Sequence, residues 1–286
     1  MAATPDAPLA ALELGSGDGE LVARFTPHAG MVGCSLRHRG EELLAPGGIP
    51  ILHPWANRLS DWGYEVAGRR VVLDRRSPLL RSDDNGLPIH GALHESALWQ
   101  AHSDGDGALR AELDYGAHDD LLAAFPFRHG LELSVRLRGP TLAVTTTVTA
   151  TGGAPVPLSF GFHPWFRLPG VPRAEWEVEL PDRHELVLDR LQLPTGQTIR
   201  RPAERGPLGE RTFDDLFRPL DVPARFALAG GGRRIVVEMG SGYPYAQVYA
   251  PPDADVVCLE PMTAPVNALT TGSGLRFVAP FARASA

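Results

Sequence analysis

Long apolar runs are missing from this chain of 286 residues, and so is any sign of a targeting segment. No stretch reaches the roughly 18 apolar residues that a membrane-spanning helix needs. Residues 1–11 lack the basic start and apolar middle of a secretory leader. We therefore expect a soluble, cytoplasmic protein with no membrane contact.

Positive charge is also in short supply. The formal net charge is −7, with 27 Lys and Arg against 34 Asp and Glu. A surface of this sign repels phosphate backbones, so we expect no nucleic-acid partner.

Cysteines and the common cofactor motifs are scarce as well. The two cysteines, Cys34 and Cys258, lie far apart and outside any CxxC motif, which favours two buried, reduced thiols over a disulfide. The sequence has no HExxH motif, no Walker loop and no GxSxG elbow, and it has no GxGxxG in a nucleotide-binding context. We expect neither a metal ion nor a cofactor.

Alternation of apolar and polar residues is abundant. Leu131, Leu133, Val135 and Leu137 alternate with polar residues, and the pattern resumes after Gly139-Pro140, which predicts a hairpin. Helical periodicity is confined to one or two turns at residues 118–124. Further strands are expected at residues 21–26, 31–38, 64–73, 109–115, 176–180, 225–229, 234–239, 246–249, 256–260 and 275–278. Strands without intervening helices favour one all-β domain over residues 1–286, a large antiparallel β-sandwich.

Two segments carry groups suited to proton transfer. In Leu158-Ser-Phe-Gly-Phe-His-Pro-Trp-Phe166, read as a strand, His163 shares a face with small residues, which leaves room for a ligand. A structural histidine at a strand end is an equally good interpretation. Glu260 ends an apolar strand just before Pro261, which we expect to break it, and a buried carboxylate needs a partner or a function.

Four further segments carry polar groups in loop or strand contexts. Arg58 and His90 lie in loop-like segments and could bind hydroxyls, although a surface ion pair and a turn histidine are the more common roles. Asp214 and Asp215 either accept hydroxyl protons or cap a short turn. Tyr245, Gln247 and Tyr249 share one strand face, which forms either a platform for a sugar ring or a solvent-facing stripe.

Together these motifs resemble the aldose 1-epimerase (galactose mutarotase) family. The matching pieces follow the family's order over most of the chain: Ala56-Asn-Arg-Leu59, Asn85-Gly-Leu-Pro-Ile-His-Gly91, His163-Pro-Trp-Phe166, Phe213-Asp-Asp-Leu-Phe217, Gln247-Val-Tyr249 and Glu260-Pro261. The resemblance implies a galactose mutarotase-like supersandwich, a monosaccharide substrate, and neither cofactor nor metal. Two departures touch the pocket wall: Ala92 stands where a second glycine is common, and Trp165 where tyrosine is common.

The resemblance also implies residue roles. His163 corresponds to the family's general acid and Glu260 to its general base. The sugar-contacting positions correspond to Arg58, His90, Asp214 and Gln247, and Asn57 belongs to the same motif as Arg58.

The implied activity is that of an isomerase that exchanges α and β anomers of a free aldose by ring opening. Glu260 takes the proton of the anomeric hydroxyl while His163 protonates the ring oxygen. We expect a charged imidazole facing an ionised carboxylate, with Asp214 supporting the imidazolium.

Three alternatives from other classes stay open. A hexose-6-phosphate 1-epimerase needs Arg37, Arg76 or Arg81 to converge on a phosphate. A non-catalytic sugar-binding module needs Arg58 but not both His163 and Glu260. A polysaccharide lyase domain is disfavoured by the short chain. The sequence leaves open which aldose is preferred and whether a homodimer forms.

Overall fold

The computed structural model describes residues 11–105 and 107–286. The expectation about a leader concerns residues that lie almost entirely outside this range. Within it, no helix has the length and apolar character required to cross a membrane. Strands dominate the structure, and their pairing is antiparallel throughout the named ladders.

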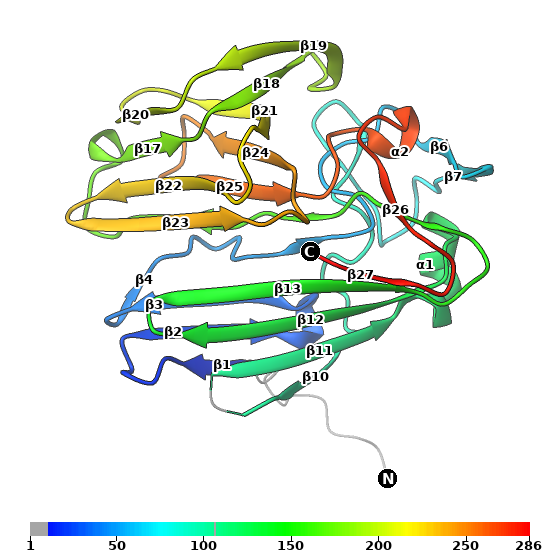
Figure 1. Ribbon diagram of the computed structural model, residues 1–286, viewed down its shortest axis with the longest axis horizontal. Coiled ribbons are helices and arrows are strands. Elements are labelled where there is room, and N and C mark those ends of the chain that lie inside the picture. The colour runs from blue at the N-terminus through cyan, green and yellow to red at the C-terminus, as the bar shows by residue number, and fades with distance from the viewer. Residues whose placement is uncertain (1–10, 106) are drawn as a thin grey trace.

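The first half of the chain builds most of two sheets, in the lower part of Figure 1. One sheet has the order β1-β2-β3-β4, with strands Leu12–Gly15, Leu21–Thr26, Val32–His38 and Glu41–Glu42. The other has the order β10-β11-β12-β13-β27, with strands Gln100–Ser103, Ala108–Asp114, His129–Arg138, Thr141–Ala150 and Arg283–Ser285. The chain's last strand therefore returns to this sheet.

The second half builds two more sheets, in the upper part of Figure 1. The larger has the order β19-β18-β21-β24-β25-β15-β5, with strands Pro194–Arg201, Arg183–Leu188, Phe213–Pro219, Tyr245–Ala250, Val257–Met262, Gly161–Phe162 and Ile51–Leu52, and β16 (Trp165–Phe166) also pairs with β25. The smaller has the order β20-β17-β22-β23, with strands Glu204–Pro207, Glu177–Leu180, Ala224–Gly230 and Arg233–Met239.

Short pairs and helices complete the chain. The pairs are β6 with β7 (Gly63–Val66, Arg69–Val72), β8 with β9 (Arg81–Ser82, Pro88–Ile89) and β14 with β26 (Val156–Leu158, Arg276–Val278). The helices are α1 (Asp119–Ala124) and α2 (Ala268–Thr271), with 3₁₀ turns at Pro27–Ala29, Tyr115–Ala117 and Arg173–Glu175. The chain thus forms the expected all-β sandwich, and α1 lies within the predicted helical turns.

Alternation explains how the sheets bury one face. The hairpin of β12 and β13 forms as predicted, with Leu137 opposite Leu142 around Gly139-Pro140. Leu131, Leu133 and Val135 are each at most 2% exposed. Each such side chain contributes about 1.5–3 kcal/mol relative to an exposed position. They join one large apolar core with residues from all four sheets.

Two expected strands are interrupted. Residues 64–73 form the β6–β7 hairpin instead of one strand, because Ala67 and Gly68 both have positive φ and make a two-residue turn. The segment from Leu158 to Phe162 is split between β14 and β15, which belong to different sheets.

Two further expectations were wrong, and one alternative that the sequence left open is excluded. Pro261 does not end its strand: β25 runs on to Met262, because β24 pairs with it on both sides of the proline. Asp214 and Asp215 lie in a seven-residue strand, β21, and not in a capped turn. Both cysteines are free as expected, but Cys34 is exposed and Cys258 alone is buried.

Candidate functional site

All seven residues selected from the sequence line a single pocket of about 200 Å³. Strands β21, β24 and β25 form one wall, and the loops before β6, after β9 and between β15 and β16 form the rest. The lining residues are Asn57, Arg58, Ile89, His90, His163, Trp165, Asp214, Gln247, Tyr249 and Glu260. Residues from 57 to 260 are therefore brought together by strand pairing.

His163 and Glu260 face each other at the base of this pocket. The imidazole Nε2 lies 3.3 Å from the carboxylate Oε1. The pairing of Trp165 with Cys258 across β16 and β25 sets this proximity, and the His163 amide donates to the Pro50 carbonyl. Glu260 is 1% exposed and His163 is 8% exposed. The two groups are thus fixed and almost completely withdrawn from bulk water.

Each member of the pair keeps a polar atom without a hydrogen-bond partner among the described residues. These atoms are Glu260 Oε2 and His163 Nδ1, and both are buried. A buried polar atom without a partner costs about 1–3 kcal/mol. Thirteen such atoms occur among the described residues, and four of them belong to residues that line this pocket. A polar ligand in the pocket would supply the missing partners.

Burial sets the protonation of the pair in a way that differs from the sequence prediction. It lowers the pKa of His163 to about 4. It also raises the pKa of Glu260 well above its usual value; the Asp214 carboxylate adds to the rise and Arg58 opposes it. Both directions favour a neutral imidazole beside a protonated carboxyl. Asp214 therefore acts on Glu260 and does not support a charged imidazole.

Trp165 packs against His163 and not toward the pocket centre. The two rings are stacked, with centroids 4.6 Å apart and planes 9° apart. A Cβ on Gly47 would overlap the indole, so glycine lets the loop backbone pass close to the ring. The stacked indole restricts the orientation of the imidazole.

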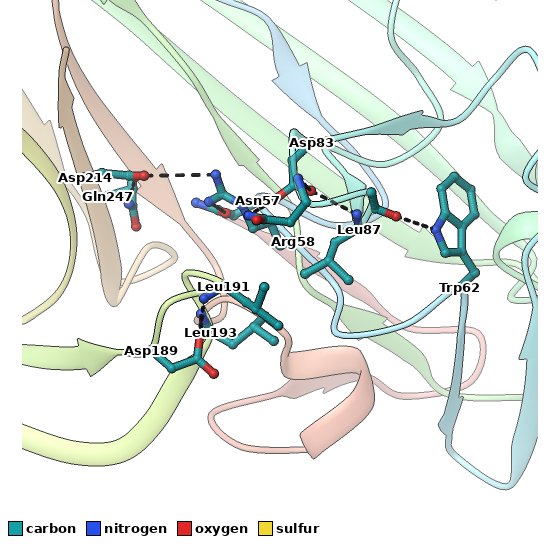
Figure 2. A network of polar contacts seen from close by, with 12 residues as sticks. Asn57, Arg58, Trp62, Asp83, Leu87, Asp189, Leu191, Leu193, Asp214 and Gln247 are labelled. Carbon is teal, nitrogen blue, oxygen red and sulfur yellow. Dashed lines mark hydrogen bonds and ion pairs between the residues drawn. The ribbon is translucent and has the colours of Figure 1, made fainter. Parts of the chain in front are cut away.

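Arg58 is oriented by a carboxylate that the sequence analysis did not select. Its Nε donates to Asp83 Oδ2 at 2.7 Å, and its Nη1 donates to Asn57 Oδ1 at 2.9 Å (Figure 2). Asn57 has a positive φ of 58°, a conformation that asparagine tolerates better than most residues. Asp83 precedes the Asn85–Gly91 motif, but nothing in the sequence indicates its contact with Arg58, 25 positions earlier.

His90 lines the pocket from a segment whose backbone packs closely against residues 53–57. Its amide donates to the Asn57 carbonyl, and its ring meets His163 edge-on at 5.4 Å. Burial, followed by the nearby His163 and Arg58, lowers the pKa of His90 well below its usual value, so it acts as a neutral hydrogen-bonding group. Gly91 has φ +73°, and a Cβ there would overlap the His53 carbonyl, so only glycine fits.

Asp214 and Gln247 form the opposite wall. The Gln247 amide donates to Asp214 Oδ1 at 2.7 Å (Figure 2), and Gln247 lies directly across the ladder from Glu260. Asp215 is outside the pocket, and burial followed by the Glu185 charge raises its pKa to about 6. Choosing Asp214 over Asp215 as the pocket residue therefore agrees with the structure.

Some residues considered in the sequence are elsewhere. Tyr245 does not line the pocket and packs against a separate apolar cluster, so the predicted platform of Tyr245, Gln247 and Tyr249 is incomplete. The arginines considered for a phosphate lie beside carboxylates outside the pocket: Arg37 with Glu42, Arg76 with Asp74 and Arg81 with Glu95.

A larger hollow of about 590 Å³ lies between β23 and the β13 edge, but it lacks this chemistry. Most of its lining is aliphatic or aromatic, and its charged groups are taken up in ion pairs, as in Arg234 with Glu179 and Glu238 with Arg225. Across residues 11–105 and 107–286, no three His, Cys, Asp or Glu side chains are grouped so that they could hold a metal ion.

Comparison with known proteins adds a family match. A family model described as aldose 1-epimerase matches residues 35–280. The uncharacterised protein YphB of Escherichia coli K12 is 27% identical over 225 residues, which cover 74% of this chain and 71% of that protein.

Solved structures show the same fold at low sequence identity. The Slr1438 protein of Synechocystis sp. PCC 6803 is 24% identical with a TM-score of 0.79, covering 100% of this chain and 96% of its own. A putative aldose 1-epimerase from Escherichia coli K12 is 19% identical with a TM-score of 0.77, covering 96% of each chain. Galactose 1-epimerase from Lactobacillus acidophilus NCFM is 14% identical with a TM-score of 0.72, covering 97% of each chain.

Proposed function

The chain belongs to the aldose 1-epimerase family, and we propose that it interconverts the α and β anomers of a free aldose in the pocket around His163 and Glu260. The observation that carries this proposal is the buried pair itself, an imidazole and a carboxyl 3.3 Å apart in a pocket walled by hydrogen-bonding groups. Anomer exchange needs one proton acceptor and one proton donor at neighbouring oxygens, and the pair supplies both.

The proton balance needs only one proton on the pair. Ring opening begins with the proton on His163 and with Glu260 ionised. Glu260 removes the proton of the O1 hydroxyl, the C1=O1 bond forms, the bond from C1 to the ring oxygen breaks, and His163 protonates the ring oxygen. Rotation about C1–C2 and the reverse transfers then close the other anomer.

The protonation favoured by burial matches the middle of this cycle. After ring opening, His163 is neutral and Glu260 is protonated, which is the arrangement that burial favours for this pair. The open-chain intermediate therefore meets a pair that needs no compensating charge. Because Nε2 and Oε1 are 3.3 Å apart, the proton that rests on Glu260 can pass directly to His163 before ring opening begins, and ring closure leaves it there for the next cycle.

The remaining pocket residues suit the ring hydroxyls of a pyranose. Arg58 and Gln247 offer N–H donors, Asp214 offers an acceptor, and neutral His90 offers one of each. In this proposal Asn57 shapes the site by holding Arg58 Nη1 and accepting the His90 amide at its carbonyl. Such groups bind the sugar equally before and during ring opening, so they lower KM more than they raise kcat.

A free sugar fits the charges better than a sugar phosphate. Among the residues that the structure describes, Arg58 is the single arginine that lines the pocket, and it is already paired with Asp83. Two carboxyl groups, Asp214 and Glu260, share the pocket with it and disfavour a dianionic substrate.

Polarimetry tests the proposal directly. Freshly dissolved α-glucose, α-galactose and other free aldoses should reach equilibrium rotation faster with protein than without, and glucose 6-phosphate should show little acceleration. Exchanging one acid–base group, in His163→Ala or Glu260→Gln, should slow the reaction by about 10²–10⁴, or roughly 3–5 kcal/mol. Asp84→Asn is the matched control, because Asp84 is exposed and does not line the pocket.

Two results contradict the proposal. If no aldose equilibrates faster than it does spontaneously, the chain is not a mutarotase for those sugars. If sugars bind saturably without acceleration, the non-catalytic binding module is the better interpretation. His163→Ala at the full wild-type rate removes His163 from the proton scheme.

A further inference from the structure

The guanidinium of Arg58 is hydrogen-bonded to the carboxylate of Asp83, a residue that does not line the pocket. Asp83 Oδ2 accepts from Arg58 Nε at 2.7 Å (Figure 2). The side chains of Asp83 and Arg58 are only 6% and 15% exposed. A hydrogen-bonded ion pair this far withdrawn from water holds its geometry, because either charge left alone would be costly.

The second oxygen of Asp83 fixes the carboxylate to its own loop. Oδ1 accepts from the amides of Asn85 and Leu87, both at 2.9 Å, and the Asp83 amide donates to the Leu87 carbonyl. Trp62 Nε1 donates to the Gly86 carbonyl at the far end of the same loop (Figure 2). The loop leads through β9 into the pocket segment, so one carboxylate ties it to Arg58.

Arg58 has a second acidic neighbour on its pocket side. Its Nη2 lies 4.0 Å from Asp214 Oδ2, beyond hydrogen-bond distance, and the Asp214 side chain is 34% exposed. An arginine without Asp83 would satisfy its charge by closing this gap. The Nη2 donor of Arg58 and the Oδ2 acceptor of Asp214 would then bond to each other, and both atoms would be turned away from a sugar hydroxyl.

We propose that Asp83 is a positioning residue that holds Arg58 away from Asp214, so that both side chains stay open to a sugar hydroxyl. This inference rests on the proposed function for the identity of the ligand, but the predicted movement of Arg58 does not. Asp83 never contacts the sugar; it acts entirely through the arginine.

The test compares Asp83→Asn with Asp84→Asn. Both remove one negative charge from the same loop, but Asp84 is exposed and makes no side-chain hydrogen bond within the described residues. In a crystal structure of Asp83→Asn, Nη2 of Arg58 should move from 4.0 Å to within about 3.2 Å of Asp214. In polarimetry, KM should rise at least tenfold while kcat changes less than threefold, because ground-state binding is lost. Asp84→Asn should match wild type in both measurements.

A second variant separates the ion pair from the turn. Asp83→Ser keeps a hydroxyl acceptor for the Leu87 amide and removes the charge, so it should reproduce the KM increase. Asp83→Asn should raise KM less when it is introduced into an Asp214→Asn background than when it is introduced into wild type. In that background Arg58 has no competing carboxylate.

Several results would overturn the positioning role of Asp83. An Arg58 that stays in place with an unchanged KM overturns the proposal, as does an equal fall in kcat for Asp83→Asn and Asp84→Asn. If both Asp83 variants fail to fold, the role of Asp83 is structural and the proposal is overturned. If wild type does not accelerate mutarotation, the proposed function fails, while the Arg58–Asp214 distance in Asp83→Asn still decides the positioning role.

Discussion

The pH dependence of anomer exchange is the sharpest test of the buried His163/Glu260 pair. The active form carries one proton on the pair, so activity is lost on the acid side when a second proton binds. Because burial lowers the pKa of His163 to about 4, this second proton is taken up only near pH 4. The value of kcat/KM reports the groups of the free enzyme, which is the state of this structure.

The magnitude follows from the titration curve. With an acid limb at about 4, kcat/KM at pH 5 keeps about 90% of its plateau. With a histidine at its ordinary value of about 6.5, only about 3% would remain at pH 5, a difference of about thirtyfold. On the alkaline side, activity falls as the pair loses its last proton, above the usual carboxyl range because burial raises the pKa of Glu260.

The assay is initial-rate polarimetry from pH 4 to 8, with the spontaneous rate subtracted at each pH. Protein is added from a stock at pH 7, and aliquots returned to pH 7 must recover full activity, which separates titration from unfolding. A reversible acid limb centred near pH 6.5 would refute the argument, because it would mean that the imidazole is charged and solvated like an exposed histidine.

Three further predictions concern neighbouring features. Trp165→Leu removes the ring stacked on His163, so kcat falls about two- to tenfold in polarimetry, whereas Trp165→Phe retains most of it. Burial lowers the pKa of His129 to about 4, below its unfolded value, so its contribution to the free energy of unfolding is complete above pH 6.5 and falls by about 2 kcal/mol between pH 7 and pH 5. Urea unfolding checks this, and a wild-type pH profile no steeper than that of His129→Gln contradicts it. Gly91→Ala overlaps a backbone carbonyl and loses more unfolding free energy than Gly86→Ala, which has a similar φ but open space.

Local alternation predicted the strands whose two faces differ. β12 and β13 follow their apolar rows closely, because each buried leucine or valine alternates with a polar residue. The strands β18 and β19 were missed for the opposite reason. Their side chains are mostly half-buried or exposed, and β19 carries glycine and polar residues with no apolar row. Their pairing partners, not their own pattern, make them strands.

Some features of the candidate site could likewise be predicted from the sequence, and others could not. His163 and Glu260 were recognisable because each follows an apolar segment with a titratable group beside a proline. Asp83 was not recognisable, because its role depends on a contact with Arg58 that no local sequence pattern encodes. The protonation of the pair could not be predicted from the sequence either. The direction of both pKa shifts comes from burial, which exists only after the sheets have formed.

The pocket concentrates departures from the rules that shape the rest of the fold, and this supports its assignment as the functional site. Four buried polar atoms there lack a partner among the described residues: His90 Nδ1, His163 Nδ1, Gln247 Oε1 and Glu260 Oε2. Two residues, Asn57 and His90, hold a left-handed backbone conformation that side chains disfavour. Each such atom favours a polar partner, because a buried polar atom without one is costly. Under the proposed function a sugar, with a hydroxyl on almost every carbon, would supply these partners together.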